Sequence, residues 1–257
     1  MAEESKGFAI ITGSAQGIGR SIALKLAEDG FDIALNDIQS QIARLKEAED
    51  DIQKLGRRCS IFVGDISNEE FVKGMIQEAA SHFGSKLDVF VANAGVVANK
   101  SVIETPVEEW DRVFAINARG TFLCYKYAAV QMISQGGGGR IIGAGSVSGK
   151  QGRPNRISYC GTKFAIRGMT QVAALDLAKY GITVNTYAPG AIETTMLAES
   201  LADDTGGVKR AGYLKNIPMG RAGQTNEVAS LVSYLASKDA GYITGQSIGI
   251  NGGTHLD

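Results

Sequence analysis

The chain has 257 residues, of which 44% are hydrophobic, and its 26 Lys and Arg residues nearly balance 27 Asp and Glu residues for a net charge of -1. This composition fits a globular protein of one or two α/β domains, and it excludes both a basic nucleic-acid-binding surface and a membrane-spanning run of ~18 apolar residues. Three cysteines without C-x-x-C spacing and an acidic, polar start at residues 1–7 fit neither a disulfide framework nor a signal peptide, so we expect a cytoplasmic protein.

Short apolar runs that predict buried strands alternate with longer runs of helical spacing. The strand-like runs lie at 8–11, 32–35, 60–63, 87–91, 140–143, 182–185 and 247–250. The helix-like runs lie at about 18–29, 39–55, 67–83, 117–134, 158–179 and 226–237. No linker interrupts this alternation. It predicts a single α/β domain over 1–257, a Rossmann-type doubly wound parallel sheet of about seven strands with helices on both faces.

Two helix starts carry capping signals. Ser67-Asn68-Glu69-Glu70 has the pattern of a capping box. Thr105-Pro106 introduces another helix and places Pro at its first helical position. Ligands of doubly wound sheets bind beyond the carboxyl ends of the strands. The segments between each strand and the next helix are therefore where we look for functional residues.

Glycines cluster in the first of these segments, Thr12-Gly13-x-x-x-Gly17-x-Gly19. Glycine lets the backbone turn tightly and approach a pyrophosphate, whose charge a helix N-terminus favours, although glycines also form ordinary turns. Asp37 ends the second strand, where a carboxylate accepts hydrogen bonds from the adenosine ribose and repels a 2′-phosphate. It could instead be a solvated turn or cap. With no basic residue at 14–16, the pattern favours NAD(H) over NADP(H).

Tyr159 and Lys163 lie four residues apart in the predicted helix 158–179, so a phenol and an ammonium share one helix face. A nearby cation favours phenolate and can bring the pKa of a tyrosine from about 10 toward working pH. Two residues alone are a weak pattern, because the same pair also occurs on helices without catalysis. The other motifs of the chain are needed to judge whether Tyr159 and Lys163 are catalytic.

Assembled in order, the motifs resemble the short-chain dehydrogenase/reductase superfamily over essentially the whole chain. The matching features are the glycine motif, Asp65, Asn93-Ala94-Gly95, Asn117, Ser146, Tyr159-x-x-x-Lys163 and Pro189-Gly190-x-Ile192-x-Thr194. One departure is Ala92, where many members have Asn. The nearest branch contains diacetyl/acetoin reductases, or 2,3-butanediol dehydrogenases. That likeness is carried by Gly17-Ile18-Gly19, by residues 163–168 and by residues 233–237.

The resemblance implies roles for four catalytic residues. Tyr159 would be the general acid for carbonyl reduction and the base for alcohol oxidation. Ser146, selected by family spacing over Ser148 and Ser158, would bind the substrate oxygen. Lys163 would contact the nicotinamide ribose, and Asn117 would hold a water in a proton relay. The implied cofactor contacts are Gly13, Gln16, Gly17, Ile18, Gly19, Asp37, Asp65, Ile66, Asn93, Gly95, Tyr159, Lys163, Pro189, Gly190, Ile192 and Thr194. Asn117 and Asp65 could alternatively be helix caps.

The expected activity is hydride transfer between NAD(H) and a small ketone, diketone or secondary alcohol of the acetoin or diacetyl kind. A 3-oxoacyl thioester reductase, which would prefer NADPH, and a polyol or sugar dehydrogenase are the alternatives. The intact catalytic set disfavours a nucleotide-binding protein without activity. His82 and His255 are isolated, so no metal site is expected.

The resemblance also implies a segment, about 191–224, that covers a small carbonyl or alcohol substrate. Met196, Leu197, Leu201 and Tyr213 would supply its apolar contacts. Arg153 and Arg156 precede Tyr159 and could attract an anionic substrate, or simply be solvated. The family assembly is a homotetramer. One interface would use helices 117–134 and 158–179, and another the last helix and strand, with no nucleic acid or membrane partner.

Overall fold

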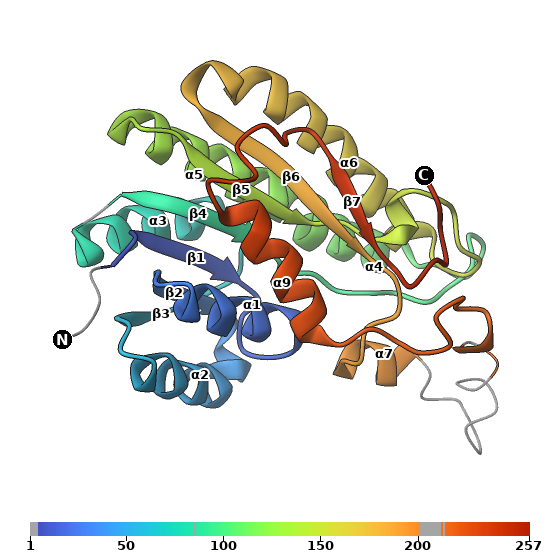
Figure 1. Ribbon diagram of the computed structural model, residues 1–257. Helices are drawn as coiled ribbons and strands as arrows, with labels where there is room; N and C mark the ends of the chain where they lie inside the picture. Colours follow the sequence, from blue (N-terminus) through green and yellow to red (C-terminus); the bar gives the residue numbers. More distant parts are fainter. Residues whose placement is uncertain (1–4, 85, 201–211, 213) are drawn as a thin grey trace.

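The computed structural model describes residues 5–84, 86–200, 212 and 214–257. These residues form a sheet of seven strands: β1 (Phe8–Thr12), β2 (Asp32–Asp37), β3 (Cys59–Val63), β4 (Leu87–Ala92), β5 (Gly139–Ala144), β6 (Ile182–Pro189) and β7 (Ser247–Ile250). Their order is β3-β2-β1-β4-β5-β6-β7, and every pair is parallel (Figure 1). The predicted Rossmann-type sheet is confirmed. Because the chain moves outward from β1 to β3 and returns to β4, the strand order reverses between β1 and β4.

Helices lie on both faces of this sheet (Figure 1). They are α1 (Gly17–Glu28), α2 (Ile42–Lys54), α3 (Glu69–Phe83), α4 (Val107–Phe114), α5 (Gly120–Gln135), α6 (Ile157–Leu177), α7 (Thr195–Ser200) and α9 (Thr225–Ala236). One face packs against α1, α2 and α9, and the other against α3, α5 and α6. In the part of the chain described, no helix is long and apolar enough to span a membrane.

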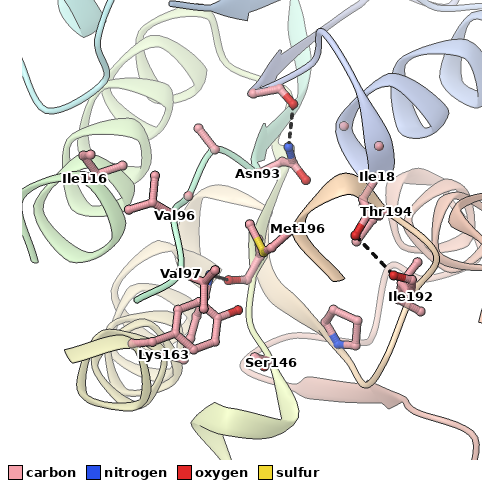
Figure 2. Close-up of a pocket in the computed structure, with 18 of the residues that line it drawn as sticks. Ile18, Asn93, Val96, Val97, Ile116, Ser146, Lys163, Ile192, Thr194 and Met196 are labelled. Atoms are coloured by element: carbon pink, nitrogen blue, oxygen red, sulfur yellow. Dashed lines mark hydrogen bonds between the residues drawn. The ribbon is translucent and has the colours of Figure 1, made fainter. Parts of the chain in front are cut away.

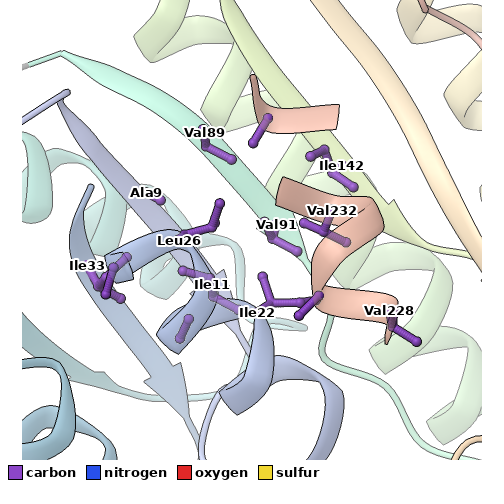
Figure 3. Close-up of a cluster of buried hydrophobic side chains, with 14 of the residues drawn as sticks. Ala9, Ile11, Ile22, Leu26, Ile33, Val89, Val91, Ile142, Val228 and Val232 are labelled. Carbon is purple, nitrogen blue, oxygen red and sulfur yellow. The ribbon is translucent and has the colours of Figure 1, made fainter. Parts of the chain in front are cut away.

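The two faces of the sheet have separate apolar cores. Successive side chains of a strand point to opposite faces, so Ala9 and Ile11 of β1 belong to one core while Phe8 and Ile10 belong to the other. All four are fully buried. Strands covered on both faces read as continuous apolar runs, which is why the sequence revealed them. Figure 3 shows the first core, where two helices meet the sheet through Ile22, Leu26, Val228, Val232, Val89, Val91 and Ile142.

Two helix starts differ from the sequence expectation by about one residue. Asn68, rather than Ser67, caps α3, because its side-chain oxygen accepts the Phe71 N–H at 3.1 Å. The Ser67 N–H instead bonds to the Asp65 carboxylate at 2.8 Å. Pro106 is the N-cap of α4 with extended ψ of 147°, not its first helical residue.

The helix expected over 117–134 begins differently. A π-helical turn, Ala115–Arg119, connects α4 to α5 and contains the buried Asn117. Wider turns of this kind are rare and frequently lie at functional sites. Helical periodicity in the sequence does not reveal one, because five residues are too few to distinguish a slightly longer repeat from the α-helical repeat.

Candidate active site

A cavity of about 640 Å³ lies at the carboxyl ends of the strands, across the point where the strand order reverses. Its size falls within the range of about 300–1,000 Å³ typical of small-molecule sites. Every site residue expected from the sequence lines it except Asn117. Figure 2 shows the middle of this cavity, with side chains from the segment after β4, from α1, from α6 and from residues 192–196 around one space.

The glycine turn is shaped by close approach as well as by backbone conformation. Gly13 and Gly17 have φ of +64° and +57°, a region that side chains disfavour. A Cβ on Gly19 would stand 2.1 Å from the Gly13 carbonyl oxygen, and one on Gly13 would stand 2.7 Å from the Ala94 Cα. No side chain caps α1, so the N–H groups of its first turn are open to an anion. This cradle fits the pyrophosphate of a dinucleotide.

Asp37 stands at the end of β2 and its carboxylate is fixed by the backbone. One oxygen accepts the Ala15 N–H at 3.1 Å and the other accepts the Ile38 N–H at 2.9 Å. A carboxylate has about four acceptor positions, so both oxygens can still accept ribose hydroxyls. Beside it, the Gln16 side chain accepts a hydrogen bond from Arg44 of α2. The Asp37 contacts hold the adenosine end of the cavity in place.

Asn93 lines the cavity, but its side chain bonds to the end of β1 and to β6. Its amide nitrogen donates to the carbonyl oxygens of Thr12 and Gly13, both at 2.9 Å, while its oxygen accepts the Tyr187 hydroxyl at 2.8 Å. Sequence reasoning did not find Tyr187. Its position within a strand gives no signal for a hydrogen bond to a residue 94 positions away. A contact from Asn93 to a cofactor would come chiefly from its backbone.

Asn117 does not line the cavity. Its side-chain oxygen accepts the Val96 N–H at 2.8 Å, and its amide nitrogen donates to the Val96 carbonyl at 2.9 Å and to the Thr162 hydroxyl at 3.2 Å. The side chain is fully buried and joins the segment after β4 to α6. A relay water would therefore have to bind a backbone carbonyl of the π-helical turn rather than the Asn117 amide.

Ser146 follows β5 and keeps a free donor. Its hydroxyl oxygen accepts the Ser148 N–H at 3.0 Å, which caps a 3₁₀ turn over Val147–Gly149. A hydroxyl has two acceptor positions and one hydrogen to donate, so the hydrogen remains available for a substrate oxygen. Ser148 also lines the cavity, whereas Ser158 does not.

Lys163 lies one helical turn beyond Tyr159 on α6. Its ammonium donates to the Ala144 carbonyl at 2.8 Å and stands 5.4 Å from the centroid of the Tyr159 ring. Burial lowers the pKa of Lys163 to about 8, so it remains mostly protonated at neutral pH. A cation at this position favours the phenolate form of Tyr159. Tyr159 and Ser146 both line the cavity. A phenol whose phenolate form is favoured is a suitable proton donor to an oxygen bound there.

The apolar end of the cavity includes Met196 and Leu197 of α7, as expected. Leu201 and Tyr213 lie outside the described residues. The groups that line the cavity thus supply a dinucleotide cradle, a tyrosine with a cationic neighbour, and an apolar wall. In the described ranges, no group of three or more His, Cys, Asp and Glu residues is arranged to hold a metal.

Comparison with known proteins agrees with this geometry. A family model described as enoyl-(acyl carrier protein) reductase matches residues 13–255. A short-chain dehydrogenase/reductase of Armillaria gallica is 47% identical over 251 residues, which cover 97% of this chain and 96% of that protein. The chain belongs to the short-chain dehydrogenase/reductase family. It is accordingly an oxidoreductase that interconverts CH–OH and C=O groups.

Two further members of the short-chain dehydrogenase/reductase family point to different substrates. The 3-oxoacyl-[acyl-carrier-protein] reductase of Staphylococcus aureus is 40% identical, covering 96% of this chain and 98% of that protein. The crystal structure of an acetoin dehydrogenase from Salmonella typhimurium superposes with a TM-score of 0.85 at 36% identity, covering 96% of this chain and 95% of the other. These comparisons give the reaction class and leave the substrate to be inferred from the site.

Proposed function

We propose that this protein is an NAD(H)-dependent oxidoreductase that transfers a hydride between nicotinamide and a small ketone, diketone or secondary alcohol, of the acetoin or diacetyl kind. The observation that carries the cofactor preference is the Asp37 carboxylate, held at the end of β2 by the Ala15 and Ile38 N–H groups. A fixed negative charge there accepts ribose hydroxyls and repels the 2′-phosphate of NADP(H). Likeness to an acetoin dehydrogenase supports the substrate class.

The proposed mechanism assigns one task to each catalytic side chain. Bound nicotinamide supplies or accepts the hydride. For reduction, Ser146 donates a hydrogen bond to the carbonyl oxygen, and Tyr159 gives that oxygen a proton as negative charge develops. Lys163 stabilises the resulting phenolate through its positive charge. For oxidation the same tyrosine acts as the base.

A second candidate is reduction of a 3-oxoacyl thioester. It is supported by the 40% identity with the Staphylococcus aureus enzyme. This function would predict a preference for NADPH, which the Asp37 carboxylate disfavours. A polyol or sugar dehydrogenase remains a further alternative within the same chemistry.

The first experiment is a set of initial rates with diacetyl and with an acetoacetyl thioester, each with NADH and with NADPH. Fast oxidation of NADH by diacetyl would support the proposed function. Turnover of the thioester with NADPH alone would replace it with the second candidate. The Tyr159→Phe variant, which we expect to bind NADH without turnover, controls for contaminating activity. Full activity in that variant would refute the mechanism.

The cofactor preference gives a direct test on Asp37. Loss of a charged hydrogen-bond partner is worth about 1.5–3 kcal/mol, so Asp37→Ala should narrow the NADH over NADPH preference in kcat/KM by roughly 10- to 100-fold. Asp37→Asn removes the charge and keeps one of the two acceptors, so either the Ala15 or the Ile38 N–H would lose its partner. Asp50→Ala, on the exposed side of α2, is the matched control. An unchanged cofactor ratio in both Asp37 variants would refute this role.

We further propose that residues 191–224 cover the substrate and that the protein is a homotetramer. Met196 and Leu197 beside the cavity support the first proposal. Exposed apolar side chains on α5 and α6, and Tyr234 and Tyr242 at and beyond the end of α9, support the second. Surfaces of this kind commonly mark protein contacts.

A further inference from the structure

Arg153 and Arg156 line the cavity in the segment between Ser146 and Tyr159. Both are half-buried. Among the described residues, neither side chain has a hydrogen bond or an ion pair. Other arginines of this chain do have carboxylate partners: Arg20 pairs with Asp51, Arg58 with Asp32 and Arg221 with Glu227.

The charge around these two arginines is not balanced by the acidic residues of the cavity. The carboxylates among its lining residues are Asp37 and Asp65, which follow β2 and β3. Arg153 and Arg156 follow β5, three strands away from β2, so the ends of these two strands are about 14 Å apart. Both Asp37 oxygens also accept backbone N–H groups.

The cofactor would leave this charge uncompensated as well. Its pyrophosphate fits the glycine turn after β1, two strands away from β5. Guanidinium groups stay protonated in proteins and bind carboxylate or phosphate with paired N–H donors. Lys163 adds a third positive charge at pH values below about 8. The substrate end of the cavity is therefore a cationic compartment without a described counterion.

We propose that the substrate carries an anionic group, a carboxylate or a phosphate, which Arg153 and Arg156 bind while Ser146 and Tyr159 engage the carbonyl. Arg156 precedes Tyr159 by three residues, about one helical turn, so the anion and the reacting carbon belong to one small molecule or to one end of a larger one. Because this inference names the substrate class of the same site, it rests on the proposed function. It keeps the proposed hydride transfer and narrows the ketone to one that carries an anionic group, so we expect diacetyl and acetoin to react more slowly than a keto acid or a phosphate-bearing ketone.

Two matched pairs of probes test the inference with NADH. Acetoacetate and its methyl ester share one ketone and differ in a carboxylate. Dihydroxyacetone phosphate and dihydroxyacetone share one ketone and differ in one phosphate close to it. We expect the charged member of at least one pair to exceed its neutral partner in kcat/KM by more than 10-fold. An advantage in the first pair identifies a carboxylate, and one in the second pair identifies a phosphate.

Substitution of each arginine then tests whether Arg153 and Arg156 cause the preference for the charged probe. Arg153→Gln and Arg156→Gln should each reduce the charged-over-neutral ratio by roughly 10- to 100-fold, because a hydrogen bond to a charged group is worth about 1.5–3 kcal/mol. Rates with the neutral probes should change little. Arg167→Gln is the matched control, since Arg167 is a half-buried residue of α6, the helix that follows both arginines, and it does not line the cavity. Equal kcat/KM within both pairs, or equal losses for charged and neutral probes, would overturn the inference.

Absence of turnover for all four probes would refute the proposed function for these compounds and still leave the anion site testable. In that case, both pairs of probes are titrated by calorimetry into the Tyr159→Phe variant saturated with NADH. Tighter binding of the charged member of either pair, lost in Arg153→Gln or Arg156→Gln, supports the anion site. Equal binding within both pairs, or no binding of any probe, overturns it.

Discussion

At Lys163 the proposed catalytic role and the stability of the fold make opposite demands. The residue is 4% exposed, and burial lowers the pKa of its ammonium from 10.5 to about 8. A base whose pKa is lower in the folded protein destabilises the fold while it is protonated. The shift of about 2.5 pKa units corresponds to about 3 kcal/mol below pH 8. This destabilisation shrinks as pH rises from about 8 to 10.5, where the lysine of the unfolded chain also loses its proton.

Lys163→Met should therefore abolish turnover without lowering stability at pH 7. Removing the buried charge gains about 3 kcal/mol, and leaving the Ala144 carbonyl without its donor loses about 1 kcal/mol. We expect the free energy of unfolding in urea, at one protein concentration without cofactor, to be unchanged or up to about 2 kcal/mol higher. The difference in free energy of unfolding between Lys163→Met and the unaltered protein should be smaller at pH 9.5. The exposed Lys73→Met is the control, and a large loss of stability at pH 7 would contradict the argument.

At the scale of elements, the π-helical turn is held by one side chain. The Asn117 amide makes three hydrogen bonds, to both backbone groups of Val96 and to Thr162, whose hydroxyl in turn donates to the Tyr159 carbonyl at 2.8 Å. The segment after β4, the turn and α6 are thus joined at one buried point. The position of the Tyr159 helix relative to the cavity depends on this connection.

Asn117→Ala should consequently lose stability as well as activity. Two part-buried backbone groups of Val96 and the buried Thr162 hydroxyl would lose their partner. We therefore expect the free energy of unfolding to fall by about 2 kcal/mol. If the Asn117 side chain only held a relay water, Asn117→Ala would lower kcat and change the free energy of unfolding little. Urea unfolding and kcat, measured on the same preparation, distinguish the two roles. Asn226→Ala, at an exposed position in α9, controls for the substitution itself.

Elements also show where sequence reasoning succeeds. Strands buried on both faces leave continuous apolar runs, and the glycine turn requires residues without Cβ, so the sheet and most cavity-lining residues were predictable. The cap of α3 was misplaced because Ser67 and Asn68 are both good caps, and only the fold selects Asn68. The Asn93–Tyr187 bond joins β6 to the segment after β4, and the side-chain role of Asn117 depends on Val96. Neither pairing leaves a local pattern.

For the whole molecule, the strand order explains why one cavity collects residues from across the chain. The reversal between β1 and β4 separates the helices that follow these strands and opens a crevice at the strand ends. The glycine turn, Asp37 and Asp65 follow β1, β2 and β3. Ser146, Tyr159 and Lys163 follow β5. A dinucleotide laid along this edge would carry its adenosine to one end and its nicotinamide to the other. The anionic group inferred for the substrate lies at the nicotinamide end, where Arg153 and Arg156 are found.

Exposed apolar side chains on α5 and α6 bear on the oligomeric state of the protein. Val130 on α5 is 57% exposed, and Val172 and Leu175 on α6 are 59% and 81% exposed. Large apolar side chains gathered on two neighbouring helices fit an interface better than solvent. In the expected homotetramer these helices would pair with their symmetry mates, so each substitution there would act twice in one interface.

Val172→Glu and Leu175→Glu should each divide the proposed tetramer into dimers, because the second proposed interface, of α9 and β7, would be unaltered. Sedimentation equilibrium should give four times the 27.1 kDa chain mass for the unaltered protein and twice that mass for the variants. Leu55→Glu introduces the same charge at a 43% exposed leucine just beyond α2, away from both expected interfaces, and should leave the mass unchanged. A mass of 27.1 kDa for the unaltered protein would refute the tetramer. Dissociation by Leu55→Glu would show instead that added charge, rather than its position, breaks the assembly.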